Sequence, residues 1–89
     1  MGQKLDDKDM QILELFVDAD GPLGSWLVAN RLADQGVEQS LATIGRSLNK
    51  LERAGCLVQK DKNRGRVITE EGLRALAMNQ HIKDLTTQT

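Results

Sequence analysis

Apolar residues spaced three to four positions apart predict two helices in the first 36 residues of the chain. We expect the first helix to begin after a capping Asp7 and to end near Ala19. The second would begin at a capping Ser25 and end at Gly36, since glycine often follows the last helical turn. The residues expected to face inward are Met10, Leu13, Phe16 and Val17 in the first helix, and Val28, Ala29 and Leu32 in the second.

A third helix is predicted over residues 40–54, with Ser40 as its cap and Gly55 as its stop. A helix turns by about 100° per residue, so its two faces can be separated from the sequence. Gly45 lies beside the apolar face, where we expect it to allow close packing against the second helix. The apolar face holds Leu41, Ile44, Leu48 and Leu51, and the opposite, polar and basic face holds Ala42, Thr43, Arg46, Asn49, Lys50 and Arg53.

Two strand-like segments follow, residues 56–60 and 66–68, and the turn-forming residues 61–65 join them into a predicted β-hairpin. Thr69 is placed to cap a fourth helix, whose first turn carries Glu70 and Glu71 at the favourable end of the helix dipole. The inward residues of this helix are expected to be Leu73, Leu76 and Ala77.

The order of these elements is typical of one fold. Helix, short strand at residues 23–24, helix, tight turn, helix, basic hairpin and helix together describe a winged helix-turn-helix. We therefore predict an α+β, mainly α fold with a three-helix core, a β-hairpin wing and a C-terminal helix. It would form a single domain over residues 1–89, folded from about residue 6 to about residue 84.

Composition narrows the classes of function. A chain of 89 residues holds one modest core and too little chain for a cleft between two lobes, which argues against most enzymes. Cys56 is the only cysteine and His81 the only histidine, so an internal disulfide and a structural zinc ligand set are both excluded. No catalytic arrangement of residues stands out, and we expect no catalysis, no cofactor and no metal. The lack of a membrane-length apolar run and the polar first eight residues favour a cytoplasmic location.

Charge is segregated along the sequence, although the net charge is only −1. Residues 1–42 carry three basic and eight acidic side chains, and residues 43–66 carry seven basic and two acidic ones. Residues 67–89 carry two basic and three acidic ones. The third helix and the hairpin therefore form a basic surface, which favours a nucleic acid as partner.

A helix that enters the DNA major groove needs an apolar side for the domain and a donor-rich side for phosphates and base edges. The third helix, residues 40–54, has both sides, and the wing, residues 61–66, can lie on the backbone or in the minor groove. Double-stranded DNA is therefore the expected partner. The candidate DNA-contacting residues are Ser25, Ser40, Ala42, Thr43, Arg46, Asn49, Lys50, Arg53, Lys62, Arg64 and Arg66.

Several of these residues have an ordinary structural alternative. Basic residues such as Arg46 are also common on solvated surfaces, and Thr43 can simply tolerate exposure. Arg64 and Arg66 flank Gly65 in the wing, where adjacent residues face opposite sides, and of the two we favour Arg64 for DNA. For Trp26, which stands at the start of the second helix, core packing is favoured over a phosphate contact.

Four motifs also carry a family resemblance: Gly-Pro-Leu-Gly-Ser at 21–25, Ala-Thr-Ile-Gly-Arg at 42–46, Leu-Glu-Arg-Ala-Gly at 51–55 and Gly-Arg-Val-Ile-Thr-Glu-Glu-Gly at 65–72. From about Ile12 to Ala77 the chain resembles the winged-helix domains of prokaryotic transcription repressors. The resemblance is nearest to the ribonuclease-R-type winged helix of nitrogen-responsive repressors and to GntR-like regulators. It implies operator binding as a homodimer, with residues 40–54 as reader and 62–66 as wing. An effector-sensing domain normally follows, so the chain is expected to be the N-terminal part of a larger regulator.

The first and fourth helices are the expected dimer contact, because apolar character continues along the fourth helix through Met78, Ile82 and Leu85. Two other functions remain open. The fold could serve as a protein-interaction or dimerisation module without DNA binding, because a fold alone does not fix function. A winged helix that binds structured RNA is the third possibility.

Overall fold

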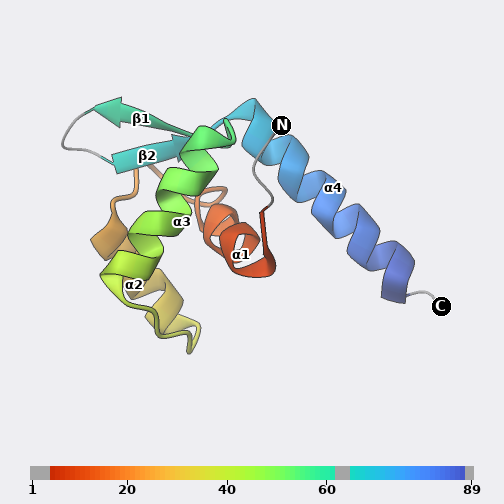
Figure 1. Ribbon diagram of the computed structural model, residues 1–89, viewed down its shortest axis with the longest axis horizontal. Helices are drawn as coiled ribbons and strands as arrows, with labels where there is room; N and C mark the ends of the chain where they lie inside the picture. Colours follow the sequence, from red (N-terminus) through yellow and green to blue (C-terminus); the bar gives the residue numbers. More distant parts are fainter. Residues whose placement is uncertain (1–4, 62–64, 88–89) are drawn as a thin grey trace.

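The structure is a computed structural model that describes residues 5–61 and 65–87, with side chains over residues 5–60 and 65–78. The described elements follow the predicted order (Figure 1). They are α1 (Asp7–Leu15), α2 (Ser25–Asp34), α3 (Leu41–Arg53), β1 (Leu57–Asp61), β2 (Gly65–Ile68) and α4 (Glu70–Thr87). The predicted fold class, a mainly helical winged helix with one β-hairpin, is confirmed.

Helix α1 begins one residue earlier and ends sooner than predicted. Its cap is Asp6 rather than Asp7: the Asp6 side chain accepts a hydrogen bond from the Asp9 backbone N–H at 2.9 Å, and the Asp9 side chain accepts one from the Asp6 N–H at 3.1 Å. The helix ends at Leu15 instead of near Ala19, because the chain tightens there. The N–H groups of residues 16 and 17 bond to carbonyls three residues back, and the Val17 side chain is left 46% exposed.

The predicted side-chain cap of α2 is wrong. Gly24 occupies the cap position with an extended backbone, no side chain caps the helix, and Ser25 is its first helical residue. The reason lies in the preceding bridge: Leu23 pairs with Arg66 through two backbone hydrogen bonds of 3.0 Å, which hold the chain extended up to the helix. The short strand predicted at residues 23–24 is thus an isolated bridge at the edge of the hairpin.

The other predicted caps are confirmed. Ser40 Oγ accepts a hydrogen bond from the Thr43 N–H at 3.1 Å and begins α3. Thr69 Oγ1 accepts from the Gly72 N–H at 3.1 Å and donates to the Gly55 carbonyl at 2.5 Å, so it joins the start of α4 to the end of α3. Gly55 has φ +83, a conformation that ends α3 and that side chains other than glycine rarely adopt.

The two strands form an antiparallel hairpin, with Leu57 opposite Ile68 and Val58 opposite Val67. Gly65, with φ +89, begins β2 where the hairpin approaches the residue 23–24 segment most closely. A Cβ atom on Gly65 would collide with the backbone of Leu23. Backbone contacts therefore join the hairpin to the segment before α2 at this point.

The core lies between α1, α2, α3 and the hairpin. Ile12, Leu13, Val28, Leu32, Ile44, Leu48 and Leu51 have no exposed area, and Leu57 is 2% exposed. Figure 1 shows α4 running away from this body toward its C-terminal end. For that reason the predicted inward face of α4 is only partly right: Leu76 is buried, whereas Leu73 is 47% exposed and Ala77 is exposed.

An ion pair joins α1 to α3. Lys50 Nζ lies 2.7 Å from Asp9 Oδ2, and the Asp9 side chain is 3% exposed. Burial by itself would raise the pKa of the Asp9 carboxyl, but hydrogen bonds from Lys50, the Asp6 backbone and the Ser47 hydroxyl together lower it below the ordinary 3.8. The bond with Asp9 in turn raises the pKa of the Lys50 ammonium above its ordinary 10.5.

Gly45 does not have the packing role predicted for it. A Cβ atom built there would meet no atom within 4 Å, so the residue faces open space rather than α2. Gly72 is the opposite case, although it is also helical. Its Cβ would lie 2.5 Å from the Cys56 carbonyl oxygen and 2.7 Å from Ile68 Cγ1.

The first prediction concerns pH. Because the pKa of Asp9 is lowered on folding, its ionised form stabilises the fold above its unfolded pKa of about 3.9, and this contribution is lost as the pH falls through the folded value. The variant Asp9→Asn removes the charge. We expect the variant to have the lower free energy of unfolding. The difference from the wild type should be largest near pH 7 and should become smaller below about pH 4. Urea unfolding across a pH series measures it, and a difference independent of pH would contradict the assignment.

The second prediction uses the two glycines as a matched pair. Alanine favours a helix over glycine by about 0.5–1 kcal/mol, so Gly45→Ala should raise the free energy of unfolding by that amount. Gly72→Ala should lower it, because overpacking costs about 1–3 kcal/mol. Denaturant unfolding of both variants tests the contrast, which a shift of the same sign in both would refute.

Candidate nucleic-acid interface

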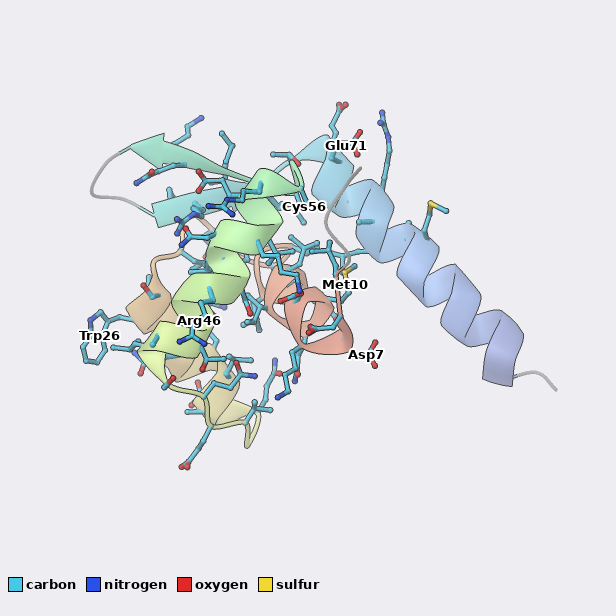
Figure 2. All side chains as sticks on the ribbon, in the orientation of Figure 1. Asp7, Met10, Trp26, Arg46, Cys56 and Glu71 are labelled. Atoms are coloured by element: carbon cyan, nitrogen blue, oxygen red, sulfur yellow. The ribbon has the colours of Figure 1, made fainter. Side chains whose placement is uncertain are left out.

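The exposed face of α3 carries a row of side chains that we name the α3 stripe: Ala42, Arg46, Asn49 and Arg53. These positions are three to four residues apart, so they align along one side of the helix, opposite the buried Ile44, Leu48 and Leu51. Figure 2 shows Arg46 projecting from the front of α3, away from the core. The amphipathic pattern of the sequence places this row correctly because the core takes the other side.

Two cations of the α3 stripe are free to meet a ligand. Arg46 and Arg53 are exposed and make no hydrogen bond or ion pair within the part of the chain that the structure describes. Arg46 lies in the first half of α3, the end that commonly reaches base edges when such a helix enters a groove. Arg53 is near the other end, so the two charges span the helix.

Two other predicted contacts on α3 are occupied within the protein. Lys50 is bound to Asp9, as described above, so it ties α3 to α1. The Thr43 hydroxyl lies 2.9 Å from Ser40 Oγ, within the turn that begins the helix. Both flank the α3 stripe on the side of α1. Their assignment as nucleic-acid contacts remains a prediction.

On its other side the α3 stripe is bordered by Arg66 of β2. The Arg66 Nε donates to Glu52 Oε1 at 2.6 Å, and its Nη2 donates to Asn49 Oδ1 at 3.2 Å. The Arg66 side chain is 20% exposed and that of Glu52 is 40% exposed. Arg66 thus joins the hairpin to α3 and neutralises the Glu52 carboxylate on this flank of the α3 stripe. The sequence pattern did not indicate this, because it brings together residues of different elements.

The structure describes some of the remaining predicted contact residues and not others. Ser40 is exposed and Ser25 is half-buried, and both lie at helix starts. Lys62 and Arg64 of the wing tip lie outside the described residues, as do the side chains of Ile82 and Leu85. Met78, the other residue predicted for dimer contact, is 67% exposed.

Trp26 is a surface residue, and the packing role favoured from the sequence is wrong. Its side chain is 71% exposed and projects outward from the first turn of α2 (Figure 2). Val28 and Leu32 take the buried side of α2, and a residue two positions before Val28 lies roughly opposite on the helix at about 100° per residue. The spacing of the apolar residues along α2 therefore predicts an exposed Trp26. The expectation of core packing came from the general preference of tryptophan for buried positions.

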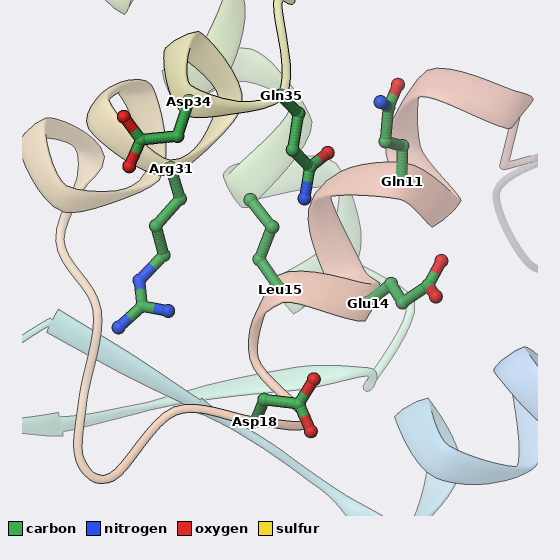
Figure 3. A pocket seen from close by; sticks show the side chains of 7 residues that line it. All are labelled: Gln11, Glu14, Leu15, Asp18, Arg31, Asp34 and Gln35. Atoms are coloured by element: carbon green, nitrogen blue, oxygen red, sulfur yellow. The ribbon is translucent and has the colours of Figure 1, made fainter.

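A groove between α1 and α2 has a different character. It has a volume of about 420 Å³ and is lined by Gln11, Glu14, Leu15, Asp18, Arg31, Asp34 and Gln35 (Figure 3). Three of the lining residues are carboxylates and one is a cation, and their side chains form no ion pair within the part of the chain that the structure describes. The carboxylates outnumber the cation, so this groove, which we name the acidic groove, would repel a phosphate backbone.

A second groove, between α1 and α4, is more apolar. It encloses about 260 Å³ and is lined by Glu14, Val17, Asp18, Leu73, Leu76 and Ala77. Val17 and Leu73 are each almost half exposed in it. These side chains, with Met78 further along α4, leave apolar area on the two helices for which the sequence predicted a dimer contact.

The described side chains offer little support for other chemistry. Among the side chains that the structure describes, no group of three or more His, Cys, Asp and Glu residues is arranged to hold a metal ion. Cys56 is buried, and burial raises the pKa of its thiol. Within residues 5–61 and 65–87, none of the helices has the length and apolar content needed to cross a lipid bilayer.

Comparison with known proteins agrees with this architecture. A crystal structure of a hypothetical protein, solved at 2.2 Å, has a TM-score of 0.71 and 28% sequence identity to this chain. The similarity covers 97% of this chain and 26% of that one, so the chain spans about a quarter of the length of that protein. No curated protein matches the sequence. Residues 10–76 match the family described as the ribonuclease R winged-helix domain. Because this match takes in well over half of the residues, the chain belongs to the ribonuclease R winged-helix domain family.

Proposed function

We propose that the chain is a sequence-specific double-stranded-DNA-binding domain of a transcription regulator, acting as a repressor, with α3 in the major groove and the hairpin on the flanking backbone or minor groove. The winged-helix fold is compatible with nucleic-acid binding. The observation that carries the proposal is the α3 stripe, an exposed row between two internal ion pairs, whose two arginines have no partner among the residues that the structure describes. Such a row offers donors to phosphates and base edges at no cost to internal contacts.

The distribution of charge supports the same orientation. The acidic groove lies between α1 and α2, and the exposed Arg46 and Arg53 lie on α3. A polyanion would be attracted to one side of the domain and repelled from the other, which orients it before contact. An enzymatic activity has no support in the arrangement of the described residues, and we propose binding alone.

Homodimerisation is part of the proposal. Operators read by helix-turn-helix dimers pair two half-sites with the two-fold symmetry of the protein. The exposed Val17, Leu73 and Met78 on α1 and α4 favour a contact through these helices. The same apolar area also supports the rival reading, in which the domain binds only another protein.

A charge-reversal variant tests DNA binding. We expect Arg46→Glu/Arg53→Glu to weaken binding to a randomised duplex pool at least tenfold at about 0.1 M salt. The slope of log K against log salt should fall by about 2, because each lost phosphate contact releases about one counterion fewer. Fluorescence anisotropy across a salt series gives both quantities, and sequencing of the retained duplexes shows whether a palindrome is enriched.

The matched control is Lys8→Glu/Arg31→Glu, which makes the same charge change on α1 and α2. It should weaken binding much less, because a change in net charge acts only at long range. Equal losses in both variants would argue against α3 as the contact. Competition between duplex DNA and structured RNA at equal concentrations distinguishes DNA binding from RNA binding. RNA binding is an alternative because the matching family takes its name from a ribonuclease.

The dimer contact is tested by Leu73→Glu/Met78→Glu. Sedimentation equilibrium at high protein concentration should show a dimer for the wild type and a monomer for the variant, because buried carboxylates without partners oppose association. Val58→Glu alters an apolar side chain of similar exposure on β1 and should leave the dimer intact. A wild-type chain that sediments as a monomer throughout would contradict the contact.

A further inference from the structure

Trp26 is a large aromatic side chain that the fold does not use. It is 71% exposed and projects outward from the first turn of α2 (Figure 2). Its indole N–H donates no hydrogen bond within the part of the chain that the structure describes. Tryptophan combines an apolar ring with a polar N–H, and such side chains are common where a protein meets a partner. The ring and the N–H of Trp26 are both available to a ligand.

The helical spacing of α2 shows which side of the domain Trp26 occupies. Ala29 and Ala33 follow Trp26 by three and seven positions, so the three residues lie along one side of the helix. The same two alanines line a groove that extends to Ser40, the cap of α3. Trp26 therefore lies on the side of α2 that adjoins the start of α3.

Leu27, the next residue in the same turn, lies on a different side of α2. It is 49% exposed. Arg31 and Asp34 follow it by four and seven positions, and both line the acidic groove between α1 and α2. Two neighbouring apolar side chains of the first turn thus lie in different surroundings, one toward the start of α3 and one toward the acidic groove.

The start of α2 is also connected to the hairpin. Leu23, three residues before Trp26, forms two backbone hydrogen bonds with Arg66 of β2. The Arg66 side chain in turn donates to Asn49 of the α3 stripe. The first turn of α2 carries no acidic residue, so no carboxylate there would repel a phosphate. Trp26 thus lies between two elements, the hairpin and α3, to which we assign DNA contacts.

We propose that Trp26 contacts the sugar-phosphate backbone of the bound duplex, with its indole N–H donating to a phosphate oxygen and its ring packing against a deoxyribose. The proposal rests on the proposed function, because it requires α3 to lie in the major groove. In helix-turn-helix domains the helix before the reading helix crosses the DNA backbone. A duplex that meets both α3 and the hairpin then passes over the start of α2. Such a contact holds the domain on the duplex and reads no base.

An uncharged backbone contact has a distinct effect on binding. Trp26→Ala should weaken binding to a randomised duplex pool about tenfold, the loss expected for a hydrogen bond to a charged group. The slope of log K against log salt should stay as in the wild type, because the indole displaces no counterion. The variant should also enrich the same sequences as the wild type. Fluorescence anisotropy across a salt series and sequencing of the retained duplexes measure these quantities.

Two further variants serve as control and as a test of the hydrogen bond. Leu27→Ala removes an apolar side chain from the same turn and should leave binding unchanged. Trp26→Phe keeps an aromatic ring and removes the N–H, so its affinity should lie between those of the wild type and Trp26→Ala. Both positions are exposed, so all three variants should fold as the wild type does, which circular dichroism checks.

The intrinsic fluorescence of the chain provides an independent measurement. Trp26 is the only tryptophan and the chain has no tyrosine, so its emission reports on this side chain alone. Addition of the enriched duplex to the wild type should change the intensity or wavelength of the emission. The change should have the same dependence on duplex concentration as the anisotropy, and Leu27→Ala should show it too.

Each contrary result has its own meaning. An unchanged DNA affinity in Trp26→Ala would overturn the proposal and favour a protein partner for the exposed ring. A smaller salt slope, altered enriched sequences, or an equal loss in Leu27→Ala would refute an uncharged contact at this position. Wild-type affinity in Trp26→Phe would refute the hydrogen bond. A wild-type chain that binds no duplex would overturn the proposed function, whereas a chain that requires Arg46 and Arg53 but not Trp26 would overturn this inference alone.

Discussion

Burial of one face of α3 is the constraint on which the rest of the structure depends. Ile44, Leu48 and Leu51 have no exposed area, and they hold the helix against α1 and α2. A straight helix that buries one side must present the other, so the rotation of α3 about its own axis is fixed by hydrophobic packing. The identity of the exposed row then follows without any further interaction.

Two ion pairs add to the hydrophobic packing that holds α3 in place. The Asp9–Lys50 pair connects α3 to α1, and the Glu52–Arg66 pair connects it to the hairpin. They lie on the two flanks of the α3 stripe, and only the second of them joins the helix to the wing. The basic surface seen along the sequence is therefore smaller in space, because two of its cations are neutralised by carboxylates of the same chain.

Much of the fold could be predicted from the sequence because local signals determine it. Ser40 and Thr69 cap their helices as their spacing suggests, and Gly36 and Gly55 both have the positive φ that ends a helix. The α3 stripe was also predictable, since periodicity alone separates it from the core. What could not be predicted depends on contacts across the chain. Arg66 seemed only a lesser DNA contact until the fold brought it beside Glu52, and Gly24 rather than Ser25 caps α2 because Leu23 pairs with a residue from the hairpin.

The lack of internal partners for Ala42, Arg46 and Arg53, within the part of the chain that the structure describes, has a consequence for divergence. The side chains at these three positions contribute little to the stability of the fold, because they neither fill the core nor take part in the ion pairs that hold α3. Surface substitutions of this kind usually change stability by no more than about 0.5 kcal/mol. Descendants of this scaffold can therefore exchange the residues of the row with little loss of stability and acquire new ligands while α1, α2 and the hairpin stay the same.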